Sequence, residues 1–148
     1  MKKAETSVSW RDFVNQLGIH CREQEVSLTE LVEWVTTWIQ QINKKTFDYY
    51  ITSGPTSEDP QVKMDFLIVL DDFLNGFTVY KDKRDCSIIP IESILQFSET
   101  ITNQNIQIRI YLTAITASTI EDRIENLPKL REFVAKVKNE WKKKLKRQ

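Results

Sequence analysis

The sequence predicts an α+β protein, because helix-like and strand-like hydrophobic patterns occupy separate parts of the chain. Apolar residues recur with helical spacing near both ends, whereas residues of about 47–116 are rich in the two-residue alternation of strands. A length of 148 residues corresponds to one domain. We therefore predict a single domain, 1–148, in which an antiparallel sheet of about four to six strands is flanked by two N-terminal helices and a long C-terminal helix.

The first predicted helix is short and covers about residues 9–17. Phe13 and Leu17 are separated by one helical turn and share one apolar face. Ser9 can cap the amino end, and Gly18 can end the helix. Such a short helix is stable only when its apolar face packs against other elements.

The second predicted helix covers about residues 28–45 and has the clearest start signal. Ser27 and Glu30 form a capping box, in which each side chain satisfies a free backbone amide near the helix start. Trp34 and Trp38 widen the apolar stripe of this helix. We expect the two tryptophans to pack against the sheet. The alternative is a surface for a protein partner or a second copy, since aromatic side chains are enriched in interfaces.

The middle of the chain predicts strands. The clearest strand precedes residue 113 and has alternating isoleucines: Ile106, Ile108 and Ile110. Asn103 to Asn105 predict the hairpin loop before it. Ile88 and Ile89 directly precede Pro90, which indicates an edge strand or a bend.

The segment 60–75 is compatible with a strand or a helix. Alternating apolar residues favour a strand, and Asn75-Gly76 would then form a two-residue hairpin turn. Asp59 and Pro60 could instead cap and begin a helix that ends at Gly76. We favour the strand, because Asn-Gly between apolar residues is a strong hairpin signal.

The C-terminal region predicts a long basic helix. Ser118 and Glu121 form a second capping box, which predicts a helix over about residues 119–146, and Pro128 would kink or restart it. Residues 1–122 contain 11 Lys and Arg against 18 Asp and Glu, whereas residues 123–148 contain 10 against 3. The basic end, about 136–148, is a candidate site for nucleic acid or another polyanion. The candidate residues are Lys138, Lys142, Lys143, Lys146 and Arg147.

Catalytic motifs are absent from the sequence. With three glycines it contains no phosphate-binding loop, and we expect no cofactor. The single histidine, His20, is expected in a loop between two helices. With Cys21 and Cys86 it supplies too few ligands for zinc. One enzymatic alternative is a metal-dependent hydrolase or nuclease, whose carboxylates would be Asp71, Asp72, Asp82 and Asp85.

These observations favour a non-catalytic binding or adaptor protein that acts through a protein–protein surface, by contact with a partner or by self-association. No run of about 18 apolar residues occurs, so we expect no transmembrane segment. Polar residues follow the basic start of the chain, so we expect no secretory signal and a cytoplasmic location with reduced cysteines. We do not expect membrane-surface binding, because the apolar stripe of the C-terminal helix is needed for packing.

Overall fold

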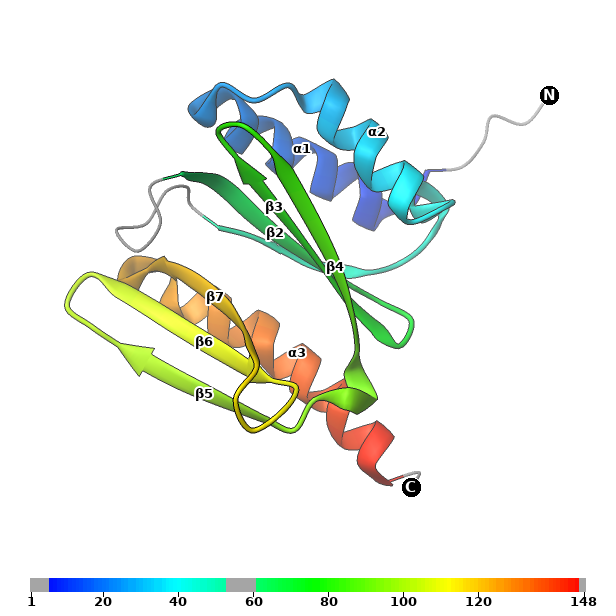
Figure 1. Cartoon of the computed structure of the whole chain (residues 1–148). Helices are drawn as coiled ribbons and strands as arrows, with labels where there is room; N and C mark the ends of the chain where they lie inside the picture. Colours follow the sequence, from blue (N-terminus) through cyan, green and yellow to red (C-terminus); the bar gives the residue numbers. More distant parts are fainter. Residues whose placement is uncertain (1–5, 53–60, 147–148) are drawn as a thin grey trace.

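A computed structural model of the chain describes residues 6–52 and 61–146 and confirms the α+β class (Figure 1). Two helices precede seven strands, and a third helix ends the described chain. The elements are α1 (Val8–Gln24), α2 (Leu28–Trp38), β1 (Asp48–Ile51), β2 (Val62–Leu70), β3 (Phe73–Tyr80), β4 (Arg84–Pro90), β5 (Gln96–Ile101), β6 (Asn105–Tyr111), β7 (Ala117–Arg123) and α3 (Leu127–Lys146).

The strands form two antiparallel sheets instead of the single predicted sheet. The first sheet has the order β1-β2-β3-β4, and the second has the order β5-β6-β7. Between them the chain passes through Pro90 and a 3₁₀-helix at Ile91–Ser93. Because this short helix turns the backbone away from the first sheet, β5 begins a new sheet.

Each face of the first sheet packs into its own hydrophobic core. Helices α1 and α2 cover one face (Figure 1), where Phe13 and Phe66 are fully buried. The other face packs with the inner face of the second sheet and with α3 around a second core. The predicted alternation is confirmed there, since Ile106, Ile108 and Ile110 are all buried in this core.

The N-terminal helices have different bounds from those predicted. Ser7, not Ser9, caps α1, since its Oγ accepts a hydrogen bond from the Trp10 amide at 3.1 Å. Gly18 lies inside α1 and does not end it, and a Cβ atom there would make ordinary contact with Leu28 Cδ2 at 3.4 Å. His20 therefore lies in a helix and not in a loop. Ser27 caps α2 as predicted, but this helix ends at Trp38.

The predicted capping box Ser118–Glu121 is wrong, because these residues belong to β7. Ile120 pairs with Ile108 of β6 and is buried in the second core. Strand pairing therefore prevails over a local four-residue pattern. Helix α3 begins later, at Leu127, and Pro128 stands in its first turn, where a missing amide costs little.

The segment 62–70 is strand β2, as favoured, but its predicted turn is wrong. Leu70 pairs with Phe73, so Asp71 and Asp72 form the two-residue turn, and Asp71 has the positive φ of 57°. Asn75 is buried inside β3 and its side-chain amide donates to Ile68 O at 3.4 Å. Asp59 and Pro60 lie outside the described residues.

Candidate interaction surface at the edge of the first sheet

Strand β4 is the last strand of the first sheet, and its outer side carries free backbone groups. The Tyr80 amide donates to Lys83 O, and the Ile91 amide donates to Asp72 O, both at 2.9 Å. These two bonds lie just beyond the two ends of the β3–β4 ladder and follow its pairing register. Because inward and outward residues alternate in an antiparallel pair, the backbone groups of Arg84, Cys86 and Ile88 point away from β3.

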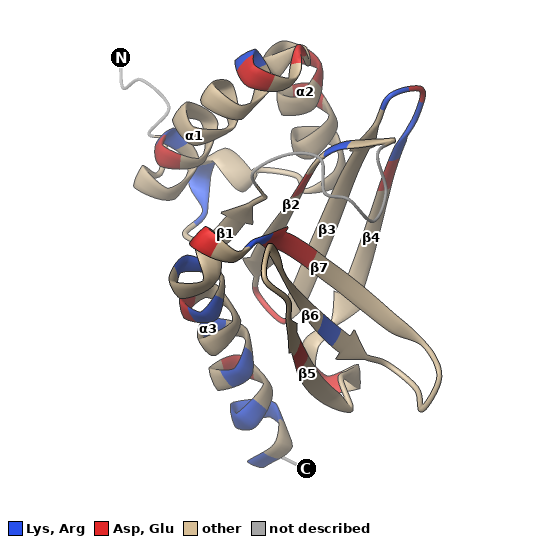
Figure 2. Ribbon diagram, turned by 90° about the vertical axis from the view of Figure 1, so that its left-hand side faces the viewer, with Lys and Arg blue, Asp and Glu red and all other residues tan. Residues whose placement is uncertain are grey.

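No other described strand pairs with this outer side, and Figure 2 shows β4 as the outermost strand of the first sheet. The side chains of this strand are exposed on both faces over most of its length. Ile88 is 50% exposed and lies diagonally beside Phe73, which is 39% exposed, on the face that carries the helices. On the opposite face, Asp85 and Ser87 are also exposed. We call the free edge from Arg84 to Ile88, together with Phe73, the β4-edge surface.

Arg84 and Cys86 connect this surface to the first core. The guanidinium carbon of Arg84 lies 5.2 Å from the centroid of the Trp34 ring. Cys86 is partly buried against the first core, and burial raises the pKa of its thiol. These contacts hold the strand in place while its outer side stays open. The sequence signal for this surface was Pro90 after two isoleucines, and the predicted edge strand is confirmed.

The edges of β1 and β5 differ from that of β4. Strand β1 has four residues and lies between α1 and α3 (Figure 2). On β5, Glu99 accepts hydrogen bonds from Arg131 of α3, one of them at 3.1 Å from Nε. This contact holds the pKa of Glu99 below its usual range. β1 is short and Glu99 lies in the middle of the β5 edge, whereas the charged residues of the free β4 edge, Arg84 and Asp85, lie at one end, so β4 is the more open of these edges.

The two predicted partner-surface residues have different environments. The Trp34 ring packs edge-on against Phe77, with centroids 5.1 Å apart, and contributes to the first core. Trp38 lies at the end of α2, on the same side of the first sheet, and is 43% exposed. Trp38 is therefore the one of the pair that a partner can reach.

The basic C-terminal helix is docked on the rest of the molecule. Trp141 Nε1 donates to Ile94 O at 2.8 Å. Lys136 pairs with Asp48 of β1 at 3.2 Å, and Lys144 pairs with Asp72 in the β2–β3 turn. The positive charge of this helix is thus partly neutralised by acidic residues of the same chain.

The predicted polyanion-binding residues that the structure describes all lie on α3 and have different surroundings. Lys138 Nζ lies 5.5 Å from the centroid of the Phe97 ring, and Lys143 pairs with Glu140 at 3.3 Å. Lys142 and Lys146 are exposed, and no ion pair with another described residue involves them. Arg147 lies outside the described residues. Figure 2 shows Lys and Arg recurring along α3, with acidic residues between them.

The four candidate metal-binding carboxylates are separated. Asp71 and Asp72 form the β2–β3 turn, whereas Asp82 lies in the β3–β4 turn and Asp85 follows on β4. The eight residues of β3 separate the two turns by about 25 Å. The four carboxylates therefore do not form one site. Across residues 6–52 and 61–146, no group of three or more His, Cys, Asp and Glu is arranged to hold a metal ion.

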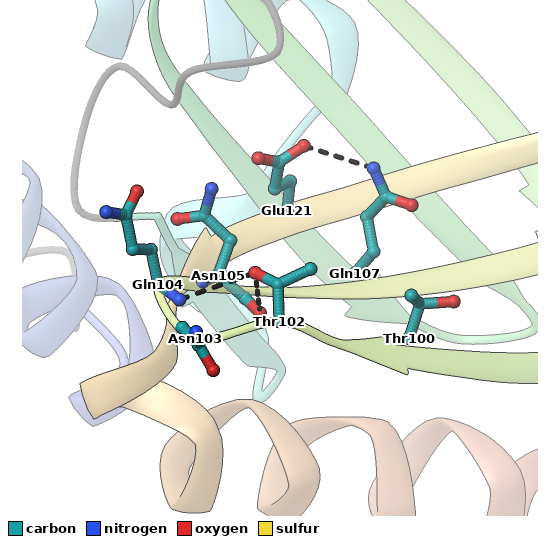
Figure 3. A pocket seen from close by; sticks show the side chains of 7 residues that line it. All are labelled: Thr100, Thr102, Asn103, Gln104, Asn105, Gln107 and Glu121. Carbon is teal, nitrogen blue, oxygen red and sulfur yellow. Dashed lines mark hydrogen bonds between the residues drawn. The ribbon is translucent and has the colours of Figure 1, made fainter.

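A polar hollow of about 570 Å³ lies at the β5–β6 end of the second sheet (Figure 3). Thr100, Gln107 and Glu121 lie side by side on adjacent strands, and Gln107 Nε2 donates to Glu121 Oε2 at 3.2 Å. The Thr102 hydroxyl accepts the Asn105 amide at 3.0 Å and so supports the hairpin turn. Amide and hydroxyl groups dominate the lining, which provides hydrogen-bonding capacity without a nucleophile–base pair.

A second hollow, of about 390 Å³, lies between α1, β1 and α3. His20 and Lys129 line it, and Tyr50 forms part of its wall. The Tyr50 hydroxyl donates to Asp122 Oδ2, and both residues are buried. Burial, together with this hydrogen bond, raises the pKa of Tyr50 well above its usual value, so the phenol stays protonated.

We expect the protein to lose stability in mild acid because of His20. Burial lowers the pKa of His20 below its usual value of 6.5, aided by Lys129 and opposed by Glu23 and Asp122. The unfolded state therefore binds more protons below pH 6.5, and the free energy of unfolding falls as the pH drops from 7 to 5. The slope is well below about 1.4 kcal/mol per pH unit, because the imidazole is only half-buried. Urea titrations at several pH values should show a flatter profile for His20→Gln, and an unchanged profile would contradict this assignment.

No protein-family model matches the sequence, and no curated protein or solved structure matches it either. Among the described helices, none is both long enough and apolar enough to cross a bilayer.

Proposed function

We propose that this chain is a non-catalytic binding or adaptor protein, and that it binds a protein partner by adding an extended segment of that partner to β4. The observation that carries the proposal is the free outward backbone of Arg84, Cys86 and Ile88. Addition of a strand to an exposed sheet edge is a recurring mode of peptide recognition, in which main-chain hydrogen bonds supply affinity.

The side chains around this edge support the same function. Phe73 and Ile88 offer an apolar contact to alternate residues of an added strand, which is the usual source of specificity in this mode. Arg84 and Asp85 supply charges of both signs at one end of the edge. Exposed apolar residues on an unpaired edge favour association, and their presence here is better explained by a partner than by stability of the isolated chain.

Selection from a random library of 12-residue displayed peptides tests this function. We expect selected peptides to protect the amides of Cys86 and Ile88 from hydrogen exchange. Ile88→Pro removes only an outward amide, which an edge strand tolerates, and should weaken peptide binding at least about tenfold. Ile101→Pro, on the outward-facing backbone of β5, is the matched control and should leave affinity unchanged. Peptides that protect other amides, or that bind Ile88→Pro equally well, would show that β4 is not the binding edge.

A further inference from the structure

We propose that the segment that pairs with β4 is β4 of a second copy of this chain, related to the first by a two-fold axis at Cys86. This inference rests on the proposed function, because it uses the same edge and names the partner. A strand edge that pairs with itself in antiparallel fashion generates a closed dimer, which is the commonest symmetry of protein oligomers.

The positions of the outward residues suit such a two-fold axis. Arg84, Cys86 and Ile88 have outward backbone groups and are spaced symmetrically about Cys86. In an antiparallel pair centred there, Cys86 faces Cys86 of the second copy, and Arg84 faces Ile88. Each outward amide then meets a carbonyl oxygen, which gives about six hydrogen bonds between the copies. Pro90, which has no amide, lies outside the paired stretch.

The side chains are compatible with this register on both faces of the sheet. On the face with the helices, the aliphatic part of Arg84 covers the half-exposed Ile88 of the second copy. On the other face, Asp85 lies opposite Ser87, whose hydroxyl can donate to the carboxylate. No like charges face each other directly, so pairing carries no cross-strand repulsion between opposed residues.

The edge of β5 does not offer the same self-complementarity. The Thr102 amide donates to Asn105 O at 2.9 Å, and this register directs the backbone of Phe97, Glu99 and Ile101 outward. A two-fold pair that uses all three residues would place Glu99 opposite Glu99. Like charges at this position disfavour pairing, and each Glu99 is already bound by Arg131.

The expected dimer is weak. The paired stretch runs only from Arg84 to Ile88, so its area is smaller than the roughly 1,200–2,000 Å² of a stable complex. We expect a dissociation constant on the order of 10–100 μM. Dimerisation should therefore depend on protein concentration in the micromolar range.

Sedimentation equilibrium of three full-length proteins tests the pairing. Wild type should convert from monomer to dimer between about 1 μM and 1 mM. Ile88→Lys places a lysine opposite Arg84 and should weaken self-association at least about tenfold. Ile88→Glu places a carboxylate opposite Arg84, and its dissociation constant should be at least about fivefold lower than that of Ile88→Lys. The two variants are matched, because both add a charge at the same exposed position. Equal effects of lysine and glutamate would exclude this register.

Thiol cross-linking supplies an independent readout. Opposed residues in a hydrogen-bonded antiparallel pair have Cα atoms about 5.5 Å apart, so a short bifunctional thiol reagent should join Cys86 to its counterpart. Cys21→Ser should cross-link like wild type, since Cys21 is buried in the first core, and Cys86→Ser should not. A wild-type protein that stays monomeric at 1 mM would overturn the second-copy proposal. If selected peptides still bind β4 in that case, the proposed function stands with a different partner.

Discussion

Phe13→Ala should lower the free energy of unfolding by about 4 kcal/mol. Phe13 is fully buried in the first core, and its ring contacts Phe47, Tyr49 and Phe66 with centroids 5.9, 5.2 and 5.7 Å away. Truncation to alanine removes the apolar contact and leaves a cavity that aromatic neighbours on two elements cannot fill without moving.

Chemical denaturation monitored by circular dichroism measures this effect, and Phe73→Ala is the matched control. Phe73 is the same residue type but is 39% exposed at the β4-edge surface. Its truncation should cost about 2 kcal/mol or less, because more than a third of the residue is already exposed to solvent. Similar losses in the two variants would mean that α1 is not packed on the first sheet as described. Phe73→Ala should also weaken peptide binding in a folded protein, because it removes part of the β4-edge surface.

Much of the fold follows from local patterns that tertiary contacts reinforce. The alternation of isoleucines before residue 113 predicted β6, and the same residues are buried on one face of the second sheet. Ser27 predicted the start of α2, and its hydroxyl accepts the Glu30 amide at 3.3 Å. In both cases one local signal and the long-range packing favour the same structure.

The wrong predictions occur where a short motif competes with a long pairing. Asn75-Gly76 is a favourable turn sequence, but a turn at Asp71-Asp72 places Phe66 opposite Phe77 and keeps both aspartates out of the ladder. Ser118 and Glu121 resemble a helix start, yet Ile120 gains burial only as part of β7. Local motifs contribute about 1 kcal/mol, which several ladder hydrogen bonds and buried side chains exceed.

The candidate surface could be predicted only in part. Pro90 after Ile88 and Ile89 indicated an edge strand, because proline cannot donate a ladder hydrogen bond. This edge is open because β5 starts a second sheet instead of pairing with β4, and no pattern in the sequence predicted that break. The charge asymmetry of the chain indicated a basic helix, but the docking of Lys136 on Asp48 and Lys144 on Asp72 required the tertiary structure.

Tyr50→Phe should lower the free energy of unfolding by about 2 kcal/mol, because it removes a hydrogen bond between the two sheets. The Tyr50 hydroxyl on β1 donates to Asp122 Oδ2 on β7, and Asp122 is fully buried. Asp122 Oδ1 keeps the Arg123 amide at 2.8 Å, but the other oxygen loses the phenol as a donor. The loss of one donor to a buried carboxylate costs more than the same loss at an exposed carboxylate, since water cannot readily replace the lost group.

Tyr49→Phe is the matched control for this prediction, since it removes the same hydroxyl from the neighbouring residue. Tyr49 donates to Asp12 Oδ2 at 2.5 Å on the exposed side of α1, where water can solvate both groups after the change. Its loss should cost less than about 1 kcal/mol. Urea denaturation of both variants gives the comparison, and equal losses would mean that the Tyr50–Asp122 bond does not hold the second sheet against the first. A larger loss for Tyr50→Phe would instead show that this bond stabilises the contact between the two sheets. Because the β4-edge surface lies at the far edge of the first sheet from β1, the folded Tyr50→Phe protein should keep its binding properties.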